Sequence, residues 1–553
     1  MPDYELKSLN LPKLTGSGLI AFTALMENPL SRQLLSGSLL ENGGIPKLRR
    51  TNLEESPTFY PLAAPASENP FPIEPFEADE KPKKLPFATA RDYRRYYQDG
   101  SLSPLDVAQR VLEAVEASEK AQPPLRAFIA IDHQEVLRQA QASAERWKKG
   151  APLSLLDGVP IAVKDEIDML PYPTTVGTRF LGTKPALKDS TVAARLRQAG
   201  AVLIGKTNMH EIGINPNGFN AHYGTARNPY NTECDCGGSS SGSAVAVAAG
   251  LVPIAIGADG GGSIRIPAAL CGLVGLKATF GRVSEFGAAP LCWSVAHIGP
   301  LTTNVEDLAL TYSIIAGSDE LDEHSLLQPP LTFWQWNKPD LSKLRIGIYK
   351  DWFEHADPEI VEAAYAAVEQ FKQAGAEVRE VVIPFLDEMR IAHAITILSE
   401  MATCMNPYRA QRNLHGAAVR LSLVLGDLFE AKDYLQAQRA RTKAMRIFSE
   451  VYKEVDVILT PATAKTAQPY PQGGLSHGWS DLSLETEMMR FIISGNLCGF
   501  PAISFPIGYD RRGLPIGMQA MSRHWEEHVL LRVAYIAEQF VNRQKPPRFY
   551  QIL

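Results

Sequence analysis

The 553-residue sequence contains only six cysteines, scattered at positions 234, 236, 271, 292, 404 and 498. So few cysteines do not provide a disulfide framework, and their scarcity is typical of a protein in a reducing compartment. Cys234 and Cys236 have no second ligand pair at the spacing of a zinc site. We therefore expect neither disulfides nor a bound metal.

The sequence also lacks an excess of positive charge, a targeting segment and a long unbroken hydrophobic run. Its formal net charge is −6 and no long basic run occurs, so we expect no nucleic-acid interface. Residues 1–13 carry no basic-then-apolar signal. The uncharged span 237–258 is interrupted by serines, glycines and Pro253, which predicts a buried interior and not a membrane-spanning helix. These features favour a cytoplasmic protein, with peripheral contact to a membrane left open.

The composition is that of a globular protein, with 45% hydrophobic and 21% charged residues, and the length allows a large core. Segments of helical and strand character alternate along the chain. We expect helices at 103–118, 132–149, 189–198, 244–250 and 358–373, and strands at 156–163, 201–204, 251–256, 344–349, 377–383, 455–461, 500–508 and 513–519. Such alternation predicts an α/β fold with a large, mixed central sheet surrounded by helices.

The N-terminal 85 residues differ from the remainder. Apolar residues recur at helical spacing between residues 16 and 40, and nine prolines between 46 and 86 predict an extended segment. We predict an N-terminal extension at 1–85, packed on a catalytic domain at 86–553. The apolar helix face has three possible contacts: the body of the protein, a membrane surface, or a second chain in a homodimer.

A glycine-rich loop follows the predicted strand 251–256. It reads Gly257-Ala258-Asp259-Gly260-Gly261-Gly262-Ser263-Ile264-Arg265. Consecutive unhindered N–H groups that end in a serine form a ready anion site, although a tight turn beneath a strand would have the same composition. Asp259 and Arg265 either brace this loop through a charge-assisted bond or face solvent as loop charges.

Two more stretches bear on the chemistry. Lys164 ends an apolar strand-like run, where desolvation would let it lose its proton near neutral pH and act as a base. A surface position or a pair with Asp165 is the alternative. The second stretch, Gly237-Gly238-Ser239-Ser240-Ser241-Gly242-Ser243, precedes a helix pattern rich in small residues.

Two rival motifs compete with these stretches. Ser240 is the centre of a nucleophile-elbow pattern, but the polar residues 232–236 do not form the strand that this motif needs. Residues 200–207 match the P-loop pattern, but their variable positions are themselves an apolar strand. The eleven histidines are dispersed, which is mild evidence against a serine–histidine pair.

Taken together, Val163-Lys164-Asp165, Gly238-Ser239-Ser240 and Gly262-Ser263-Ile264-Arg265 resemble the amidase signature family of serine hydrolases in both wording and separation. The resemblance implies that Ser263 is the nucleophile, that Ser239 bridges it to Lys164, and that neutral Lys164 is the base. It also implies a cis Gly238–Ser239 peptide, an oxyanion hole of N–H groups from Gly260, Gly261, Gly262 and Ser263, supporting roles for Ser240, Asp259 and Arg265, and no metal or cofactor.

Further stretches, including residues 10–16, 208–211, 259–267 and 514–517, resemble the plant-type fatty acid amide hydrolase branch of that family. This resemblance implies a small-molecule acyl amide substrate, such as an N-acylethanolamine. The alternatives are an aryl or short-acyl amidase or esterase, an amidotransferase-like subunit that supplies ammonia to a partner, and a non-enzymatic scaffold. For Lys164 to be neutral, we further expect that Asp165, Glu166 and Asp168 point away from its amine or pair elsewhere.

Overall fold

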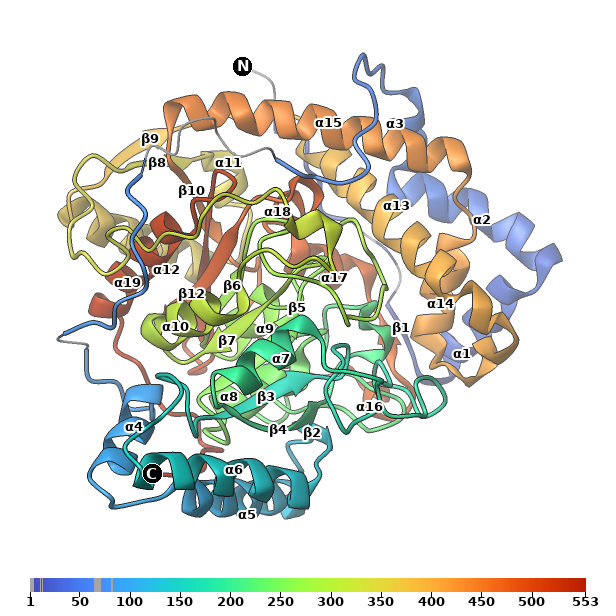
Figure 1. Cartoon of the computed structure of the whole chain (residues 1–553). Helices are drawn as coiled ribbons and strands as arrows, with labels where there is room; N and C mark the ends of the chain where they lie inside the picture. Colours follow the sequence, from blue (N-terminus) through green and yellow to red (C-terminus); the bar gives the residue numbers. More distant parts are fainter. Residues whose placement is uncertain (1–3, 10, 12, 64–70, 81–82) are drawn as a thin grey trace.

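The computed structural model describes residues 4–9, 11, 13–63, 71–80 and 83–553 (Figure 1). Within these residues, eleven strands form one central sheet. Their order across the sheet is β2 (Phe128–Ala130), β4 (Val202–Thr207), β3 (Pro160–Lys164), β5 (Ile254–Ala258), β7 (Ile298–Thr302), β6 (Val274–Lys277), β12 (Ala502–Tyr509), β13 (Pro515–Ser522), β10 (Val457–Pro461), β8 (Arg345–Ile348) and β9 (Glu377–Glu380). The pairs β3–β4, β3–β5, β8–β10 and β8–β9 are parallel and the other neighbours are antiparallel, so the sheet is mixed.

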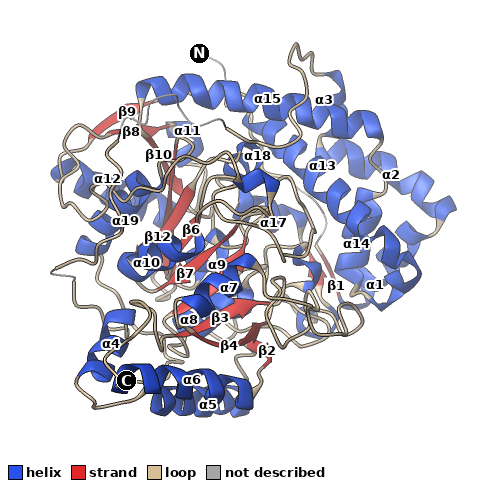
Figure 2. Cartoon of the chain, in the orientation of Figure 1, coloured by secondary structure: helices blue, strands red, loops and turns tan. Residues whose placement is uncertain are grey.

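Helices surround the sheet (Figure 2), which confirms the predicted α/β class. They are α1 (Gly16–Glu27), α2 (Pro29–Gly43), α3 (Ile45–Arg50), α4 (Ala90–Gln98), α5 (Pro104–Lys120), α6 (His133–Lys148), α7 (Thr191–Gln198), α8 (Ser241–Ala248), α9 (Arg265–Leu270), α10 (Val305–Ile315), α11 (Lys350–Phe353), α12 (Pro358–Gln373), α13 (Leu386–Met405), α14 (Ala417–Gly426), α15 (Ala431–Glu454), α16 (Gly474–His477), α17 (Leu482–Met489), α18 (Ile493–Cys498) and α19 (Glu527–Phe540). Short 3₁₀ turns, η1 (Glu211–Gly213), η2 (Glu323–Ser325) and η3 (Asn406–Leu414), and a small strand pair, β1 (Leu14–Thr15) with β11 (Trp479–Ser480), complete the described elements. In the described part of the chain, no helix combines the length and hydropathy needed to cross a bilayer.

Most of the predicted elements form close to the expected positions. Helix α5 begins after Ser103, whose side chain accepts the Asp106 N–H in a capping box. The two C-terminal strands pair as the antiparallel hairpin β12–β13. The strand predicted to begin at residue 156 instead begins at Pro160, because Gly158 has a φ of +84° and turns the chain just before it.

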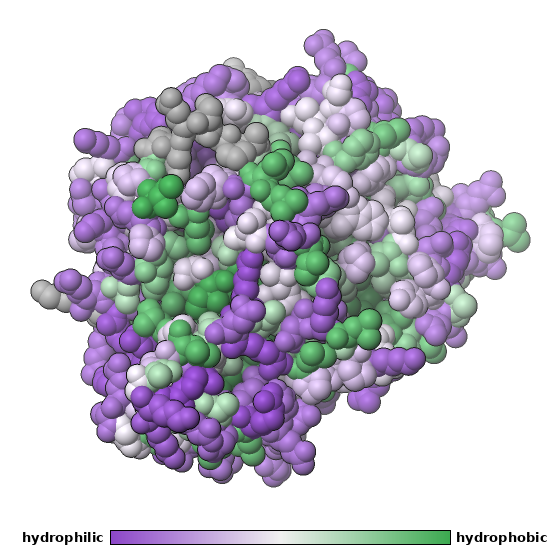
Figure 3. Space-filling view, viewed as in Figure 1, coloured by the Kyte–Doolittle hydropathy of each residue, from purple (hydrophilic) through white to green (hydrophobic). Residues whose placement is uncertain are grey.

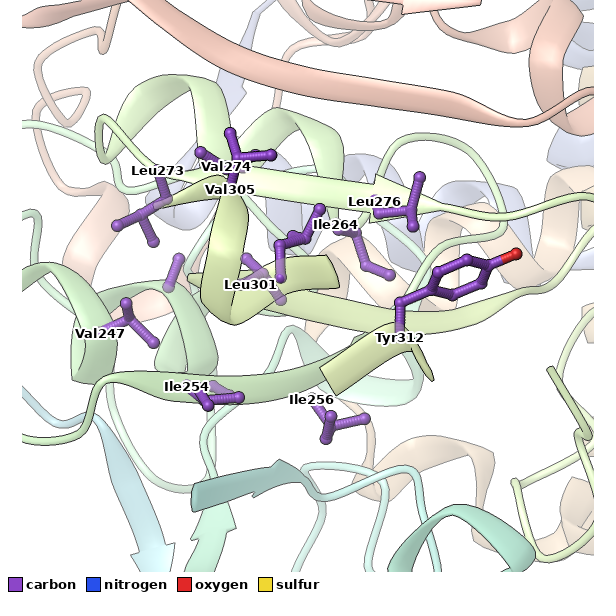
Figure 4. Close-up of a cluster of buried hydrophobic side chains, with 14 of the residues drawn as sticks. Val247, Ile254, Ile256, Ile264, Leu273, Val274, Leu276, Leu301, Val305 and Tyr312 are labelled. Carbon is purple, nitrogen blue, oxygen red and sulfur yellow. The ribbon is translucent and has the colours of Figure 1, made fainter. Parts of the chain in front are cut away.

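The middle of the sheet carries the core that supports the glycine loop (Figure 4). Side chains from α8, β5, β6, β7 and α10 meet here, among them Val247, Ile254, Ile256, Leu276, Leu301, Val305 and Tyr312. Ile264 is fully buried in the same cluster. Burial of an aliphatic side chain of this size contributes about 1.5–3 kcal/mol. Since Ile264 directly follows Ser263, the core fixes the backbone that carries this serine.

The N-terminal helical pattern forms two helices, where the sequence predicted one over residues 16–40. The break lies at Asn28, whose backbone is extended and whose side chain accepts the N–H groups of Leu30 and Ser31. Pro29 follows, and a residue before proline disfavours the helical conformation. Asn28 therefore ends α1 and caps α2.

The two N-terminal helices divide their apolar residues between the body and solvent. Leu19 and Met26 are buried against α14. In contrast, Leu25, Leu30 and Leu34 are 49%, 78% and 84% exposed. A hydrophobic spot is visible at the right-hand edge of the molecule, where α1 and α2 meet (Figure 3). The division at residue 86 stays a prediction, and residues 1–3, 10, 12, 64–70 and 81–82 of the extension lie outside the described residues.

Candidate active site

Lys164 lies at the C-terminal end of β3 and is 1% exposed. Because β3 runs parallel to β5, its amine reaches the end of the neighbouring strand. Lys164 Nζ donates to Ser239 Oγ at 2.9 Å and to the carbonyl oxygen of Ala258 at 3.1 Å. The alternative of a surface lysine is therefore wrong.

The acids after Lys164 differ in where they point. Asp165 pairs with Lys206 at 3.3 Å and accepts the Gly177 N–H, while Asp168 accepts the Thr174 hydroxyl. The predicted alternative of a Lys164–Asp165 pair is thus wrong as well.

Glu166 behaves differently from the two aspartates. Its Oε2 lies 2.8 Å from Lys164 Nζ, and both side chains are more than nine-tenths buried. The expectation that this acid points away is wrong, because the chain turns at residues 164–167. There the Ile167 N–H donates to the Lys164 carbonyl at 3.1 Å, and the turn brings the carboxylate back to the amine.

Ser239 and Ser263 are held by backbone contacts on either side of Lys164. The Gly238–Ser239 peptide is cis, as the resemblance implied, and the Ser239 carbonyl accepts the His210 N–H at 3.2 Å. The Ser263 carbonyl accepts the Ser240 N–H at 3.2 Å. Among the described residues, no hydrogen bond joins the hydroxyls of Ser239 and Ser263. The structure thus brings Lys164 to Ser239, and the link onward to Ser263 stays a prediction.

The Ser240 hydroxyl is fully buried and bonded to the end of β5. It donates to the Ala258 carbonyl at 3.1 Å and accepts the Ala258 N–H at 3.3 Å. This geometry suits the supporting role predicted for Ser240 and does not suit a nucleophile. The rival P-loop is also wrong, because Val202–Thr207 is strand β4, whose backbone groups pair with β3.

Asp259 and Arg265 form a fully buried ion pair inside the glycine loop. Arg265 Nε lies 3.1 Å from Asp259 Oδ2, and its Nη2 lies 3.1 Å from Oδ1. Both residues are 0% exposed, so the alternative of solvent-facing loop charges is wrong. Arg265 also donates to Asn496 Oδ1 at 2.5 Å and to Gln519 Oε1 at 2.7 Å.

Asp259 is itself the acceptor that shapes the loop. Burial alone would raise the pKa of this carboxyl, but the Arg265 charge and the hydrogen bonds from Arg265 and Asn496 outweigh burial and hold the pKa far below its usual range. Its oxygens accept the N–H groups of Gly262 at 2.7 Å and Ile264 at 3.1 Å. The carboxylate therefore stays charged and holds the loop closed around itself.

This arrangement corrects one member of the predicted oxyanion hole. The Gly262 N–H already donates to Asp259, so it cannot also serve an oxyanion. Within the described residues, the N–H groups of Gly260, Gly261 and Ser263 have no hydrogen-bond acceptor. A Cβ on Gly260 would lie 2.5 Å from Cys292 Sγ, so a side chain here would displace Cys292 or the loop. The predicted oxyanion hole is therefore reduced to the N–H groups of Gly260, Gly261 and Ser263.

An apolar cluster lies beside the loop and leads away from it. A Cβ placed on Gly213 would lie 3.3 Å from Ser239 Oγ and 3.7 Å from Leu291 Cδ1, so both residues border Gly213. The cluster extends from there to α13 and α14, and its buried members are Val176, Leu181, Ile212, Leu291, Cys292, Val295, Met401, Met405, Val419 and Leu423. These side chains are at most 7% exposed and pack against one another as part of the core.

The roles of three polar residues of the site were not predicted from the sequence. Glu166 was expected to point away, while Asn496 and Gln519 were not predicted to take part. Asn496 lies in α18 and Gln519 in β13, two segments of mostly apolar and small residues, and both amides are fully buried. A single amide inside an apolar run predicts a buried hydrogen-bond network, so a signal for these two was present.

Comparison with known proteins places these features in context. The amidase family model matches residues 109–531. A fatty acid amide hydrolase of Oryza sativa subsp. indica is 39% identical, over 100% of this chain and 96% of its own length. A glutamyl-tRNA(Gln) amidotransferase subunit of Cyanothece sp. is 35% identical over 82% of this chain and 98% of its own. The solved structure of a bacterial aryl acylamidase is 26% identical, with a TM-score of 0.74 over 82% of this chain and 96% of that one.

Proposed function

Because the chain belongs to the amidase signature family and is an amidase, we propose that it hydrolyses fatty acid amides, such as N-acylethanolamines, with a Ser-Ser-Lys triad. The products are a free fatty acid and an amine. The similarity to plant fatty acid amide hydrolases supports this substrate class, since it extends over the whole chain, including the N-terminal 85 residues.

In the proposed reaction, Ser263 Oγ attacks the amide carbonyl while its proton passes through the Ser239 hydroxyl to neutral Lys164. The N–H groups of Gly260, Gly261 and Ser263 stabilise the oxyanion, and one such donor is typically worth about 10²–10³ in kcat. The proton on Lys164 returns through Ser239 to the leaving nitrogen, which departs as the free amine. Water then attacks the acyl-enzyme by the same proton path, releasing the acid and restoring Ser263.

The observation that carries the preference for a fatty chain is the apolar cluster beside Ser239. Its buried hydrophobic side chains extend from Leu291 to α13 and α14. Each methylene transferred from water into such surroundings contributes about 0.8 kcal/mol. A short acyl group would leave most of these contacts unused.

The deciding experiment compares kcat/KM for a long-chain acylethanolamide with that for a short aryl amide. We expect a large preference for the long chain. Ser263→Ala should abolish turnover and covalent labelling by a fluorophosphonate while the circular dichroism spectrum stays unchanged. Equal or higher kcat/KM for the short aryl amide would contradict the substrate class, and labelling that persists in Ser263→Ala would contradict the assignment of the nucleophile.

The similarity to amidotransferase subunits supports one alternative, in which the chain releases ammonia from glutamine for a partner. Glutaminase activity that appears only with a co-purifying partner would favour it. Such activity combined with no hydrolysis of acylethanolamides would replace the proposal above.

The exposed leucines of α1 and α2 support a second part of the proposal, contact with a lipid surface from which the substrate enters. Leu30→Glu with Leu34→Glu should reduce sedimentation with phosphatidylcholine vesicles. Leu187→Glu is a matched control, because Leu187 is 100% exposed on another part of the chain. Equal sedimentation of all variants would contradict lipid contact, and loss of dimers in the double variant would assign this face to a homodimer.

A further inference from the structure

We propose that Glu166 is a positioning residue that holds the proton of Lys164 and thereby sets the lowest pH at which the triad works. This inference rests on the proposed function, because it takes Lys164 to be the base. The proposed triad needs only the Lys164 amine and the hydroxyls of Ser239 and Ser263. Glu166 is an additional acidic side chain that lies against this amine.

The geometry of the pair is close and sheltered. Glu166 Oε2 lies 2.8 Å from Lys164 Nζ, with side chains 7% and 1% exposed. The other contacts of the amine are uncharged, namely Ser239 Oγ at 2.9 Å and the Ala258 carbonyl at 3.1 Å. A carboxylate at this distance stabilises the ammonium form of the lysine. Glu166 therefore opposes the loss of the proton that the base must give up.

Two other titratable groups among the described residues interact with Lys164, and both are uncharged at pH 7. His210 faces it from the segment after β4, and burial lowers the pKa of this imidazole to about 4, so the ring is neutral at pH 7. Cys292 faces it from the loop before β7, and burial raises the pKa of this thiol well above its usual range. Among the described residues that touch the amine, Glu166 is thus the charged one.

Glu166 also connects the pair to a cavity. A space of about 200 Å³ is lined by Glu166, Ala258, Leu291, Glu285 and Asp322, among others. Burial raises the pKa of the Glu285 carboxyl well above its usual range, and the nearby charges of Asp322 and Glu166 act in the same direction. Burial thus favours the protonated form of Glu285, whereas Glu166 is the carboxyl of this wall that lies against the lysine.

The sign of the effect follows from the charge. The acid limb of kcat/KM reports the loss of a proton from the essential base of the free enzyme. Replacement of the carboxylate by an amide removes the negative charge that stabilises the ammonium. The neutral amine then persists to lower pH, so the acid limb of Glu166→Gln should lie below that of the parent by about 1–3 pH units.

The experiment measures kcat/KM for an acylethanolamide and the rate of fluorophosphonate labelling between about pH 5 and pH 10. The matched control is Glu285→Gln, which replaces another acid of the same cavity and should leave both acid limbs in place, because among the described residues Glu285 makes no ion pair with Lys164. A purely structural role for Glu166 would lower the rates at every pH without moving the limb, and that result would overturn the inference.

The remaining outcomes are also decisive. If the parent chain neither hydrolyses acyl amides nor reacts with the label, the proposed function fails; if it does both and Glu166→Gln keeps the acid limb, only the present inference fails. Should Glu166→Gln not fold, Glu166→Asp is the second variant. It keeps the carboxylate but places it one methylene farther from the Lys164 amine. Its acid limb should then move to lower pH by a smaller amount, and a folded Glu166→Asp with an unmoved limb would overturn the inference.

Discussion

Removal of the charge on Asp259 is the perturbation whose effect the structure defines most completely. In Asp259→Asn the side chain keeps its size, but Arg265 loses the partner that neutralises it in a site with no solvent exposure. Breaking a buried ion pair in this way costs about 3–5 kcal/mol. The amide also has only one oxygen, so it cannot accept the Gly262 and Ile264 N–H groups on two separate oxygens as the carboxylate does.

This loss of folding free energy can be measured as a decrease in the melting temperature, Tm. An unfolding entropy of about 2.1 cal/mol/K per residue gives about 1.2 kcal/mol/K for 553 residues, so Tm should fall by about 3–4 °C. Differential scanning calorimetry measures this directly. Asp340→Asn, at an exposed loop position where the side chain accepts only from Ser342, is the control and should leave Tm unchanged. The loop that carries Ser263 also loses its central hydrogen-bond acceptor. We therefore expect kcat to fall even at temperatures where the variant is fully folded.

The pH dependence and a second substitution test the cause. The pKa of Asp259 is depressed in the folded state, so its contribution to stability is complete above the unfolded value of about 3.9 and is lost only as pH falls below it. The Tm difference between parent and Asp259→Asn should therefore be constant from neutral pH down to about 4. Arg265→Gln added to Asp259→Asn should cost less than the sum of the two single changes, since no unpaired charge remains. Additive losses, or an unchanged Tm in Asp259→Asn, would refute the reasoning.

Two further changes probe the same site. Gly260→Ala places a methyl group 2.5 Å from Cys292 Sγ, so kcat should fall by about 10²-fold as the N–H donors of the loop shift. The control is Gly508→Ala, which has no atom within 4 Å of the new methyl group and should retain full activity. Similar kcat values for the two variants would show that the loop tolerates displacement. Lys164→Met and Ser239→Ala should each remove most of kcat, and the double variant should lose little more than either alone, because the two groups act as a unit; multiplied losses would show independent roles.

The sequence predicted those parts of the site that depend on local patterns. Lys164 was expected at the end of a buried strand, and the parallel pairing of β3 with β5 indeed brings its amine to Ala258 and Ser239. The α/β class followed from alternating segments of strand and helix. The break between α1 and α2 was also readable, since Asn28 precedes Pro29, but the continuous apolar spacing on both sides favoured a single helix.

What the sequence did not predict depends on turns and on distant contacts. Whether Glu166 points at Lys164 or away is decided by the turn at 164–167, which the residue types do not specify. The commitment of the Gly262 N–H to Asp259 depends on the closed shape of the loop. Asn496 and Gln519 come from segments that only the order of strands in the sheet brings next to Arg265.

The partners of Arg265 have a consequence for how the enzyme comes into being. Asn496 lies 231 residues after Arg265 in the chain and Gln519 lies 254 residues after it. During synthesis, Ser263 is therefore made long before the segments that hold its neighbour Arg265. The buried hydrogen-bond network around Arg265 can therefore be completed only after these two segments, both near the C-terminal end of the chain, have been synthesised.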